Sequence, residues 1–207
     1  MPISPGSAWG VPSSVPNDLL QFRSDREIGI FLRDHDAKQI HATNIAYQKG
    51  DFIKVLGLEG VRNVDQCLKV ILDAVSVEYV DADGYSHQDV CIGSFHIGNR
   101  FLRGAISIVS NSGYWRGREV APRSHPNDGK LDIVELSAAM KWAQRRMAWK
   151  KALTGSHLPH PLIQYSQGEF FQWSGKNRRL VIDGKFVSQV QKVSCRVQSD
   201  CLELFVL

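Results

Sequence analysis

The segment Val75-Ser76-Val77-Glu78-Tyr79-Val80 alternates apolar and polar side chains, and the pair Asp83-Gly84 follows it closely. Such alternation predicts a half-buried strand, and Asp-Gly after it is a strong signal for a hairpin turn. Strand-like segments recur after it, at residues 89–97, 104–110, 131–135, 169–173, 179–182, 192–197 and 202–207. The sequence therefore predicts a mainly β fold, a β-sandwich of short antiparallel strands.

Further strands are expected upstream of this segment. The turn Lys49-Gly50-Asp51 lies between two strand-like segments, residues 40–45 and 52–56. Together the segments and the turn predict a hairpin. Residues 64–74 fit a helix or a strand equally well. The first 24 residues are rich in Pro, Gly and Ser and predict a loop. We accordingly divide the chain into a loop-rich N-terminal segment (1–38) and a β-sandwich domain (39–207).

Two helices interrupt the predicted strands. A short N-terminal helix is expected over 24–33, where Ser24 and Glu27 have the spacing of a capping box. A long helix is expected over about 137–153, followed by Gly155 and two prolines that end it. Its apolar residues form two stripes, one of Leu136, Met140, Ala143 and Met147 and a second of Trp142, Trp149 and Leu153.

Composition excludes several classes of protein. The 207 residues are 43% hydrophobic and 22% charged, which is typical of a globular domain. The net charge of +4 is spread along the chain, so we do not expect nucleic acid as a partner. The four cysteines form no C-x-x-C pair, which excludes the usual structural zinc site. Without a secretory signal pattern or a long apolar run, we expect a cytoplasmic protein with reduced cysteines.

Two Asp-Gly turns are the candidates for chemistry. Asn127-Asp128-Gly129 leads into a predicted strand, and its oxygen atoms suit a hard cation such as Mg²⁺. Asp183-Gly184 could place a general base at the end of a hairpin. Either turn can equally be structural, with the carboxylate bonded to nearby backbone. His157 and His160 lack an evident third metal ligand, so we expect them to lie at a helix end on the surface.

The predicted long helix is basic and contains two tryptophans. Trp142 and Trp149 are seven residues apart, beside five Lys or Arg residues and no acidic one. Tryptophan with Lys and Arg is typical of a membrane interface. The alternative is a solvated basic face over a packed stripe.

These features occur in an order that resembles the bacterial diacylglycerol kinase and lipid kinase family, which shares its fold with the sphingosine and NAD kinases. The family has an Asn, a Gly-rich turn and a stretch like A-P-x-A-x-x-D-D-G-x-L-D. In this chain they correspond to Asn111, residues 113–117 and residues 121–132. A G-x-H-x-x-H-P motif is similar to residues 155–161, and L-D-G-E is similar to residues 182–185.

The resemblance covers residues 39–207 and implies the C-terminal β-sandwich domain of a lipid kinase. It implies Asp183 as the general base that takes the proton of a lipid hydroxyl. It also implies a structural Mg²⁺ site at Asp128, with Asn127 as a neighbour. The sequence departs from the pattern at Lys185, Asn127 and Arg123, where the family has acidic residues.

The resemblance implies transfer of the ATP γ-phosphate to a lipid hydroxyl, with ATP and Mg²⁺ as cofactors. The family's G-G-D-G-T phosphate loop is absent from this sequence. Activity would then need an ATP-binding domain, on a separate subunit or upstream. The alternative is a non-catalytic module derived from the family that binds lipid or protein. The expected partners are a lipid substrate or a membrane surface, with a homodimer as a further option.

Overall fold

The computed structural model describes residues 10–47, 49–55, 67–99 and 103–206. In this part of the chain, eleven strands form one strongly bent sheet, and two short strands pair separately. The helices are α1 (Asp25–Asp34), α2 (Ala37–His41), α3 (Asp51–Val55) and α4 (Trp142–Lys151). The strands before residue 100 are β1 (Val11–Ser13), β2 (Leu19–Phe22), β3 (Asn44–Tyr47), β4 (Cys67–Asp81), β5 (Ser86–Cys91) and β6 (Ser94–Gly98). The later strands are β7 (Ile106–Ser110), β8 (Tyr114–Trp115), β9 (Arg118–Glu119), β10 (Leu131–Leu136), β11 (Ile163–Gly168), β12 (Phe170–Ile182) and β13 (Lys185–Val206).

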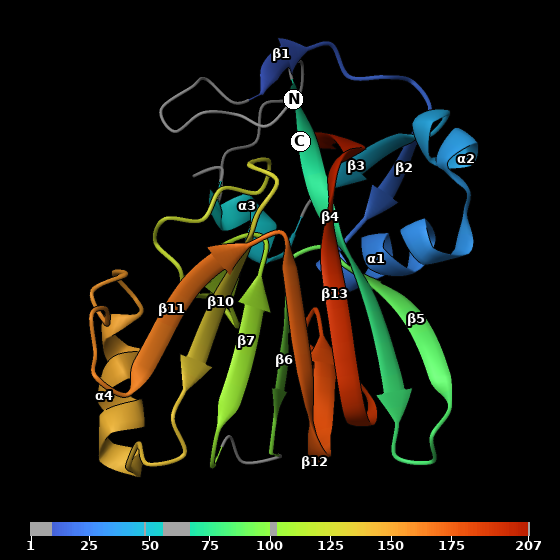
Figure 1. Cartoon of the computed structure of the whole chain (residues 1–207). Coiled ribbons are helices and arrows are strands. Elements are labelled where there is room, and N and C mark those ends of the chain that lie inside the picture. The colour runs from blue at the N-terminus through green and yellow to red at the C-terminus, as the bar shows by residue number, and fades with distance from the viewer. Residues whose placement is uncertain (1–9, 48, 56–66, 100–102, 207) are drawn as a thin grey trace.

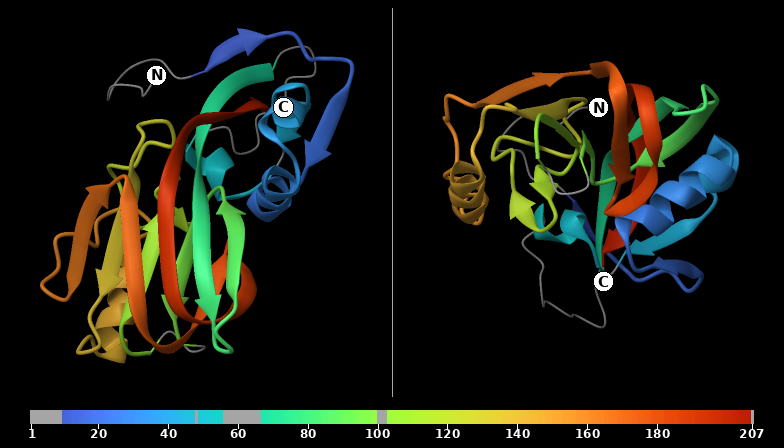
Figure 2. Two further views of the ribbon diagram at one scale, coloured as in Figure 1. Left: turned by 45° about the vertical axis from the view of Figure 1, so that its right-hand side comes forward. Right: turned by 90° about the horizontal axis from the view of Figure 1, so that it is seen from below.

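The main path of the sheet runs β1-β4-β13-β12-β6-β7-β10-β11, and its pairs are antiparallel. The predicted hairpin at Asp83-Gly84 is confirmed, since it joins β4 to β5 and Gly84 has a φ of 91°. Irregular pairing lets the long strands bend, between Ser174 and Arg178 in β12 and between Gln198 and Leu202 in β13. The bends fold the sheet over its own core, as Figure 2 shows, which confirms the predicted mainly β, sandwich-like fold.

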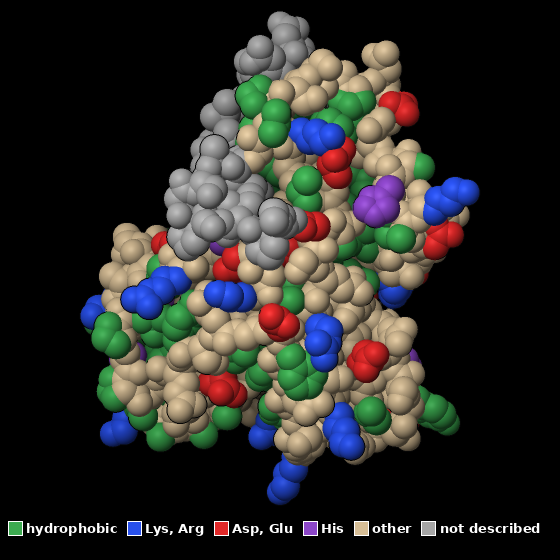
Figure 3. Space-filling view, turned by 45° about the horizontal axis from the view of Figure 1, so that its top comes forward, with side chains coloured by type: hydrophobic (Ala, Val, Ile, Leu, Met, Phe, Trp, Pro, Cys, Tyr) green, Lys and Arg blue, Asp and Glu red, His purple; other side chains and the backbone are tan. Residues whose placement is uncertain are grey.

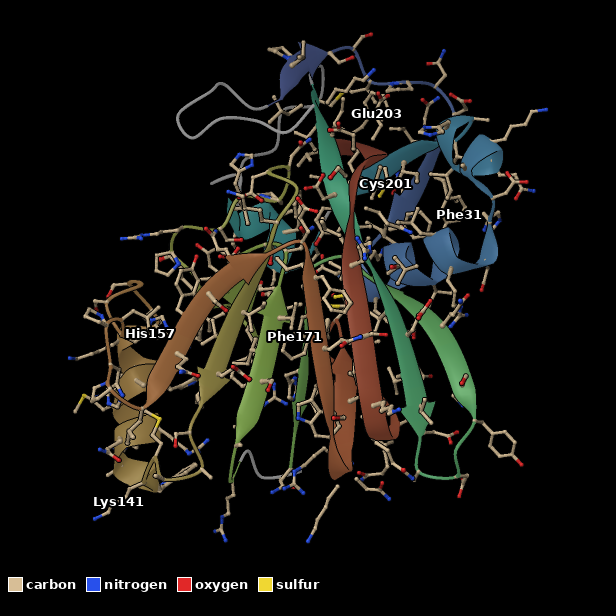
Figure 4. The ribbon with its side chains drawn as sticks, viewed as in Figure 1. Phe31, Lys141, His157, Phe171, Cys201 and Glu203 are labelled. Carbon is tan, nitrogen blue, oxygen red and sulfur yellow. The ribbon has the colours of Figure 1, made fainter. Side chains whose placement is uncertain are left out.

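Two separate cores lie against the same two long strands. The sandwich core contains Val75 and Val77 of β4, and Phe171 lies within it in Figure 4. The α1 core contains Val70 and Leu72 of β4, packed against helix α1. Side chains alternate between the two faces of a strand, so these two pairs point to opposite faces. Strand β13 is shared in the same way and contributes to both cores.

The N-terminal segment forms a unit that the sequence did not predict. Strands β2 and β3 are parallel, β3 also pairs with β13 in parallel, and α1 and α2 connect β2 to β3 (Figure 1). The α1 prediction is confirmed, because Ser24 Oγ accepts a hydrogen bond from Glu27 N at 3.3 Å. The α1 core joins side chains from both sides of residue 38, and the domain boundary placed there stays a prediction.

The hairpin predicted for residues 40–56 is wrong. Residues 37–41 form helix α2, because the Asp36 side chain caps it and Gln39 completes a capping box. Residues 51–55 form helix α3, which buries the neighbouring Phe52 and Ile53 on one side. Adjacent apolar residues can share a helix face but not a strand face. The predicted strand end at residue 56 lies outside the described residues.

Helix α4 is shorter than predicted and packs on another face. The helix begins at Trp142 rather than near residue 137. At this start the Gln144 side chain accepts a hydrogen bond from Lys141 N at 2.8 Å. Arg145 and Ala148 face inward, whereas Met147 of the first predicted stripe is 57% exposed. Arg145 donates to the carbonyl oxygens of Met140 and Ser137, and these bonds turn its side chain toward the protein.

Candidate functional site

The Asp183-Gly184 turn joins β12 to β13 and brings a carboxylate back onto strand β6. Both residues have positive φ, 46° and 78°, as expected at the centre of a tight hairpin turn. The Asp183 carboxylate accepts hydrogen bonds from three consecutive backbone groups, Ile92 N at 3.0 Å, Gly93 N at 2.9 Å and Ser94 N at 3.1 Å. Burial raises the pKa of this carboxyl, and the N–H donors oppose that rise.

A second carboxylate, Asp25, lies beside Asp183. Asp25 is in the first turn of α1 and is 8% exposed, and it accepts hydrogen bonds from the Tyr47 hydroxyl and from Asp51 N. Burial, and then the nearby Asp183 charge, raise the pKa of Asp25 to about 7. Gly93 permits this approach, because a Cβ there would lie 2.9 Å from Asp25 Oδ2.

These carboxylates face a cavity of about 310 Å³, which we call the acidic pocket. The name refers to its three aspartates. Three basic residues also line the pocket, so its formal charges balance. The lining residues are Arg23, Ser24, Asp25, Lys49, Gly50, Asp51, Ser94, His96, Trp115, Arg116, Asp183 and Gly184. A pocket with clustered ionisable groups of raised pKa is the usual form of a site for proton transfer.

His96 presents a neutral imidazole at the same pocket. The Trp115 indole N–H donates a hydrogen bond to His96 Nδ1 at 3.1 Å, so Nδ1 carries no proton. Burial, and then the positive charge of Arg116, lower the pKa of His96 to about 4. At neutral pH the ring proton therefore lies on Nε2, and His96 is a hydrogen-bond donor of constant charge.

The Asp128-Gly129 turn, predicted as a metal site, lies elsewhere, among a group of buried polar residues. Asp128 Oδ1 accepts from Lys130 N at 3.0 Å, and burial raises the pKa of this carboxyl to about 6. Gly129 N donates at 2.8 Å to Asp73, whose other carboxylate oxygen accepts from Asp200 N at 2.9 Å. Asp73 thus ties the turn to strands β4 and β13.

The fit of Mg²⁺ to this turn is partial. The buried oxygens Asn127 Oδ1, Asn111 Oδ1 and Asp132 Oδ2 have no hydrogen-bond partner in the part of the chain that the structure describes, and oxygen atoms of this kind are ligands that Mg²⁺ accepts. Within the described residues, however, no group of three or more His, Cys, Asp or Glu side chains is arranged to hold a metal ion. A cation here would depend on the carboxylates of Asp128 and Asp132 together with amide oxygens.

The two histidines after α4 have structural roles. His157 is 6% exposed, and its Nε2 lies 3.1 Å from the carbonyl oxygen of Val120. His160 Nδ1 accepts from Leu162 N at 3.1 Å. His157 is therefore buried rather than on the surface, which corrects its predicted location.

The two tryptophans of α4 differ in exposure. Trp142 is 69% exposed, as contact with a membrane requires. Trp149 packs inward, with its ring centroid 5.3 Å from that of Trp115 and the Arg118 guanidinium over it. This packing does not fit the membrane contact predicted for Trp149. Within the described residues, no helix has the length and apolar character that would let it span a membrane.

Sequence reasoning missed Asp25, Tyr47 and His96. The capping signal at Ser24 and Glu27 correctly placed Asp25 in the first turn of α1. No spacing in the sequence links residue 25 to residue 183, because their approach depends on the packing of α1 against β5, where Arg26 forms an ion pair with Asp89.

Comparison with known proteins supports the fold. A family model described as the YegS C-terminal NAD kinase beta sandwich-like domain matches residues 75–206. A diacylglycerol kinase structure from Bacillus anthracis str. Sterne matches with a TM-score of 0.63 and 12% identity, over 90% of this chain and 77% of that one. A putative diacylglycerol kinase from the same organism matches with a TM-score of 0.57 and 12% identity, over 92% and 77%. At such identity the likeness to these structures concerns the fold alone.

More remotely, the structure of a yeast NADH kinase matches with a TM-score of 0.48 and 8% identity, over 92% of this chain and 61% of that one. Its similarity is too low to support an argument. No curated protein matches the sequence.

Proposed function

The chain belongs to the family of the YegS C-terminal NAD kinase beta sandwich-like domain, and from this premise we propose that it forms the acceptor side of an ATP-dependent phosphotransferase. The acceptor would be a lipid hydroxyl, as in a diacylglycerol kinase. The observation that carries the proposal is the pairing of Asp25 and Asp183 in the acidic pocket, with a pKa of about 7 at Asp25.

The pair would serve as the proton acceptor. The hydroxyl oxygen forms a bond to the γ-phosphorus of ATP while the bond from that phosphorus to the β–γ bridging oxygen breaks, and ADP leaves. The hydroxyl proton passes to the carboxylate pair. A base whose pKa lies near neutral pH is well matched to this step. The proton would belong to the pair rather than to one residue, since the two groups interact strongly.

In this proposal Asp183 is not a general base on its own, as the sequence resemblance implied, but one member of a pair. Four donors, three backbone N–H groups and the Cys91 thiol, already bind the Asp183 carboxylate. Asp183 would therefore hold the pair in place and raise the pKa of Asp25, so that the pair takes up the proton near neutral pH. His96 Nε2–H could donate to an oxygen of the bound acceptor or of the phosphoryl group. Phosphate-binding groups and Mg²⁺ would come mainly from an ATP-binding domain.

The test is transfer of labelled phosphate from ATP to diacylglycerol in mixed micelles with Mg²⁺, with NAD as a second acceptor. The chain is assayed alone and as the native complex purified through a tag on this chain. The variants are Asp25→Asn and Asp183→Asn, with Asp34→Asn as the control on the exposed end of α1. Transfer to lipid that is lost in both pocket variants and kept in the control supports the proposal. Transfer to NAD instead would overturn the lipid acceptor.

A non-catalytic module is the second candidate. It is favoured by Lys185, which stands exposed where the resembling family has an acidic residue, and by the saturated hydrogen bonding of Asp183. No transfer to any acceptor by the folded chain or its native complex would favour this candidate over the kinase.

A further inference from the structure

Helix α4 and the turn after it present an outward surface that mixes apolar and cationic side chains. Trp142, Met147 and Leu153 are 69%, 57% and 62% exposed. Four basic side chains are exposed around them, Lys141, Arg146, Lys150 and Lys151. We call these seven residues the α4 surface. Figure 4 shows α4 alongside β11, with Lys141 at one end and His157 beyond the other.

The charge of this surface has one sign. No Asp or Glu occurs in the sequence between Glu135 and Glu169. An acidic side chain from another segment, Glu119, comes close to Gly155 beyond the helix. In Figure 3, green and blue side chains lie side by side along the left-hand edge, the side on which Figure 1 places α4.

The inner side of α4 is fixed to the body of the protein. Ala148 and Ala152 are buried, and Trp149 packs on Trp115. Arg145 donates to backbone carbonyl oxygens at the start of the helix rather than contributing to the outer charge. The outward direction of Trp142 is therefore set by packing on the opposite side, and the surface exists before any partner binds.

We propose that the α4 surface docks the protein on an anionic lipid bilayer, with the Trp142 ring at the level of the headgroups. Tryptophan prefers this interfacial depth, and long Lys and Arg side chains can keep their charges near the phosphates while their stems lie on apolar groups. A bilayer suits the mixture because it needs no continuous apolar stripe.

A protein groove fits the surface less well. A helix that binds in a groove presents apolar anchors three, four or seven residues apart on one stripe. Here the exposed apolar residues are five and six positions apart, and Arg146 and Lys150 lie between them. The arrangement therefore favours a planar anionic partner over an apolar groove.

The space beside Trp142 is also open. A cavity of about 420 Å³ lies at the start of α4, lined by Arg103, Gly104, Met140, Trp142 and Arg145. It gives lipid headgroups room next to the indole and places the arginine Arg103 at their level. This proposal does not rest on phosphoryl transfer, because the surface would bind lipid whether or not the acidic pocket is active.

The test is co-sedimentation of the full chain with vesicles of phosphatidylcholine, with and without phosphatidylglycerol. We expect binding to the anionic vesicles that weakens strongly as salt rises from ~0.05 to ~0.5 M, since screening shortens the reach of surface charge. The double variant Arg146→Glu and Lys150→Glu should lower the affinity at least about tenfold, because each basic residue near such a surface contributes severalfold. The matched control is Lys38→Glu with Lys176→Glu, two exposed lysines outside α4.

The tryptophan is tested separately. Trp142→Ala should weaken vesicle binding about three- to tenfold, whereas Tyr85→Ala, which removes an aromatic side chain of equal exposure on the β4–β5 hairpin, should change it less than about twofold. Thermal unfolding followed by circular dichroism checks that each variant is folded. Equal effects of the two aromatic variants, equal effects of the two charge variants, or no binding to anionic vesicles at low salt would each overturn the proposal.

Discussion

Two turns with the same Asp-Gly sequence perform different tasks in this molecule. At Asp183-Gly184 the aspartate side chain itself reaches across to strand β6 and lines a cavity. At Asp128-Gly129 it is the glycine N–H that is anchored, to the carboxylate of Asp73, while Asp128 bonds within its own turn. The first turn positions a charge where a ligand can reach it, and the second fastens a loop to the sheet.

The difference shows that a motif of two residues does not determine its own role. Both glycines have positive φ, 70° at Gly129 and 78° at Gly184, but Asp183 also has a positive φ of 46° whereas Asp128 does not have a positive φ. The partner that each turn meets differs as well. A free run of backbone N–H groups meets Asp183, and a buried carboxylate meets Gly129. The following changes test whether this division into a site and an anchor is correct.

The largest effect is expected at the anchor. Asp73→Ala leaves Gly129 N and Asp200 N without their acceptor in a buried region, and it should lower the free energy of unfolding by about 3–5 kcal/mol. Urea unfolding measures this loss, with the exposed Asp34→Ala as control. A loss no larger than that of the control would mean that Asp73 does not anchor the turn.

At the acidic pocket, we expect stability to depend on pH through Asp25. Its pKa is raised from 3.8 to about 7 by folding, so the folded protein holds the proton more tightly than the unfolded chain. The resulting stabilisation is fully present below the unfolded pKa and is lost as pH rises through about 7, an effect on the order of 2–4 kcal/mol. Asp25→Asn should flatten this part of the pH profile of the unfolding free energy. If the slope of that pH profile is the same in Asp25→Asn, folding does not raise the pKa of Asp25.

Asp183→Asn tests both roles of Asp183 in the pocket, as a hydrogen-bond acceptor and as a charge beside Asp25. An amide can accept hydrogen bonds on one atom only, so one or more backbone N–H groups of residues 92–94 would lose a partner, at about 2–3 kcal/mol. Removal of the charge should also lower the pKa of Asp25, because like-charge repulsion from Asp183 contributes to its present value. Carboxyl NMR titration of Asp25 reads this shift. If the pKa of Asp25 stays near 7 in Asp183→Asn, burial alone raises it.

The smallest effect is expected from Mg²⁺ at Asp128. With two carboxylates at most, those of Asp128 and Asp132, and otherwise neutral oxygens as ligands, millimolar Mg²⁺ should stabilise the protein by about 1 kcal/mol or less. Thermal unfolding with and without MgCl₂ measures it, and Asp128→Asn should abolish it while Asp34→Asn does not. If Mg²⁺ stabilises the protein by several kcal/mol and Asp128→Asn abolishes this effect, the Asp128-Gly129 turn is a metal-binding site and not only an anchor.

Much of the fold could be predicted from local pattern. Alternation in Val75–Val80 and the Asp83-Gly84 turn correctly indicated the second half of β4 and the hairpin after it, because these depend on neighbours in sequence. The strand predicted over residues 89–97 is instead two strands, β5 and β6, which separate at Ile92 and Gly93. The short α2 and α3 could not be separated from strands in the same way. The sequence does not show that Phe52 and Ile53 are buried on the same side, and their shared burial in the α1 core is what identifies a helix.

The candidate site was predictable only in part. Asp183 was identified because an Asp-Gly turn and a family resemblance both point to it. Asp25 could not be identified, because its pKa and its contacts arise from packing between segments about 160 residues apart in sequence, and the packing of α1 on β5 was not foreseen. The inward position of Trp149 likewise depends on Trp115, which lies on a separate strand.

The sharing of β4 and β13 between two cores has a consequence for synthesis on the ribosome. Both cores include side chains from residues 185–206, and β13 pairs with β4 residues more than one hundred positions earlier, as in the contact of Ser76 with Arg196. Neither core can close until that strand has left the exit tunnel. The nascent chain must therefore keep β4 unpaired on the β13 side while residues 82–184 are synthesised, which makes this strand a natural binding segment for a chaperone.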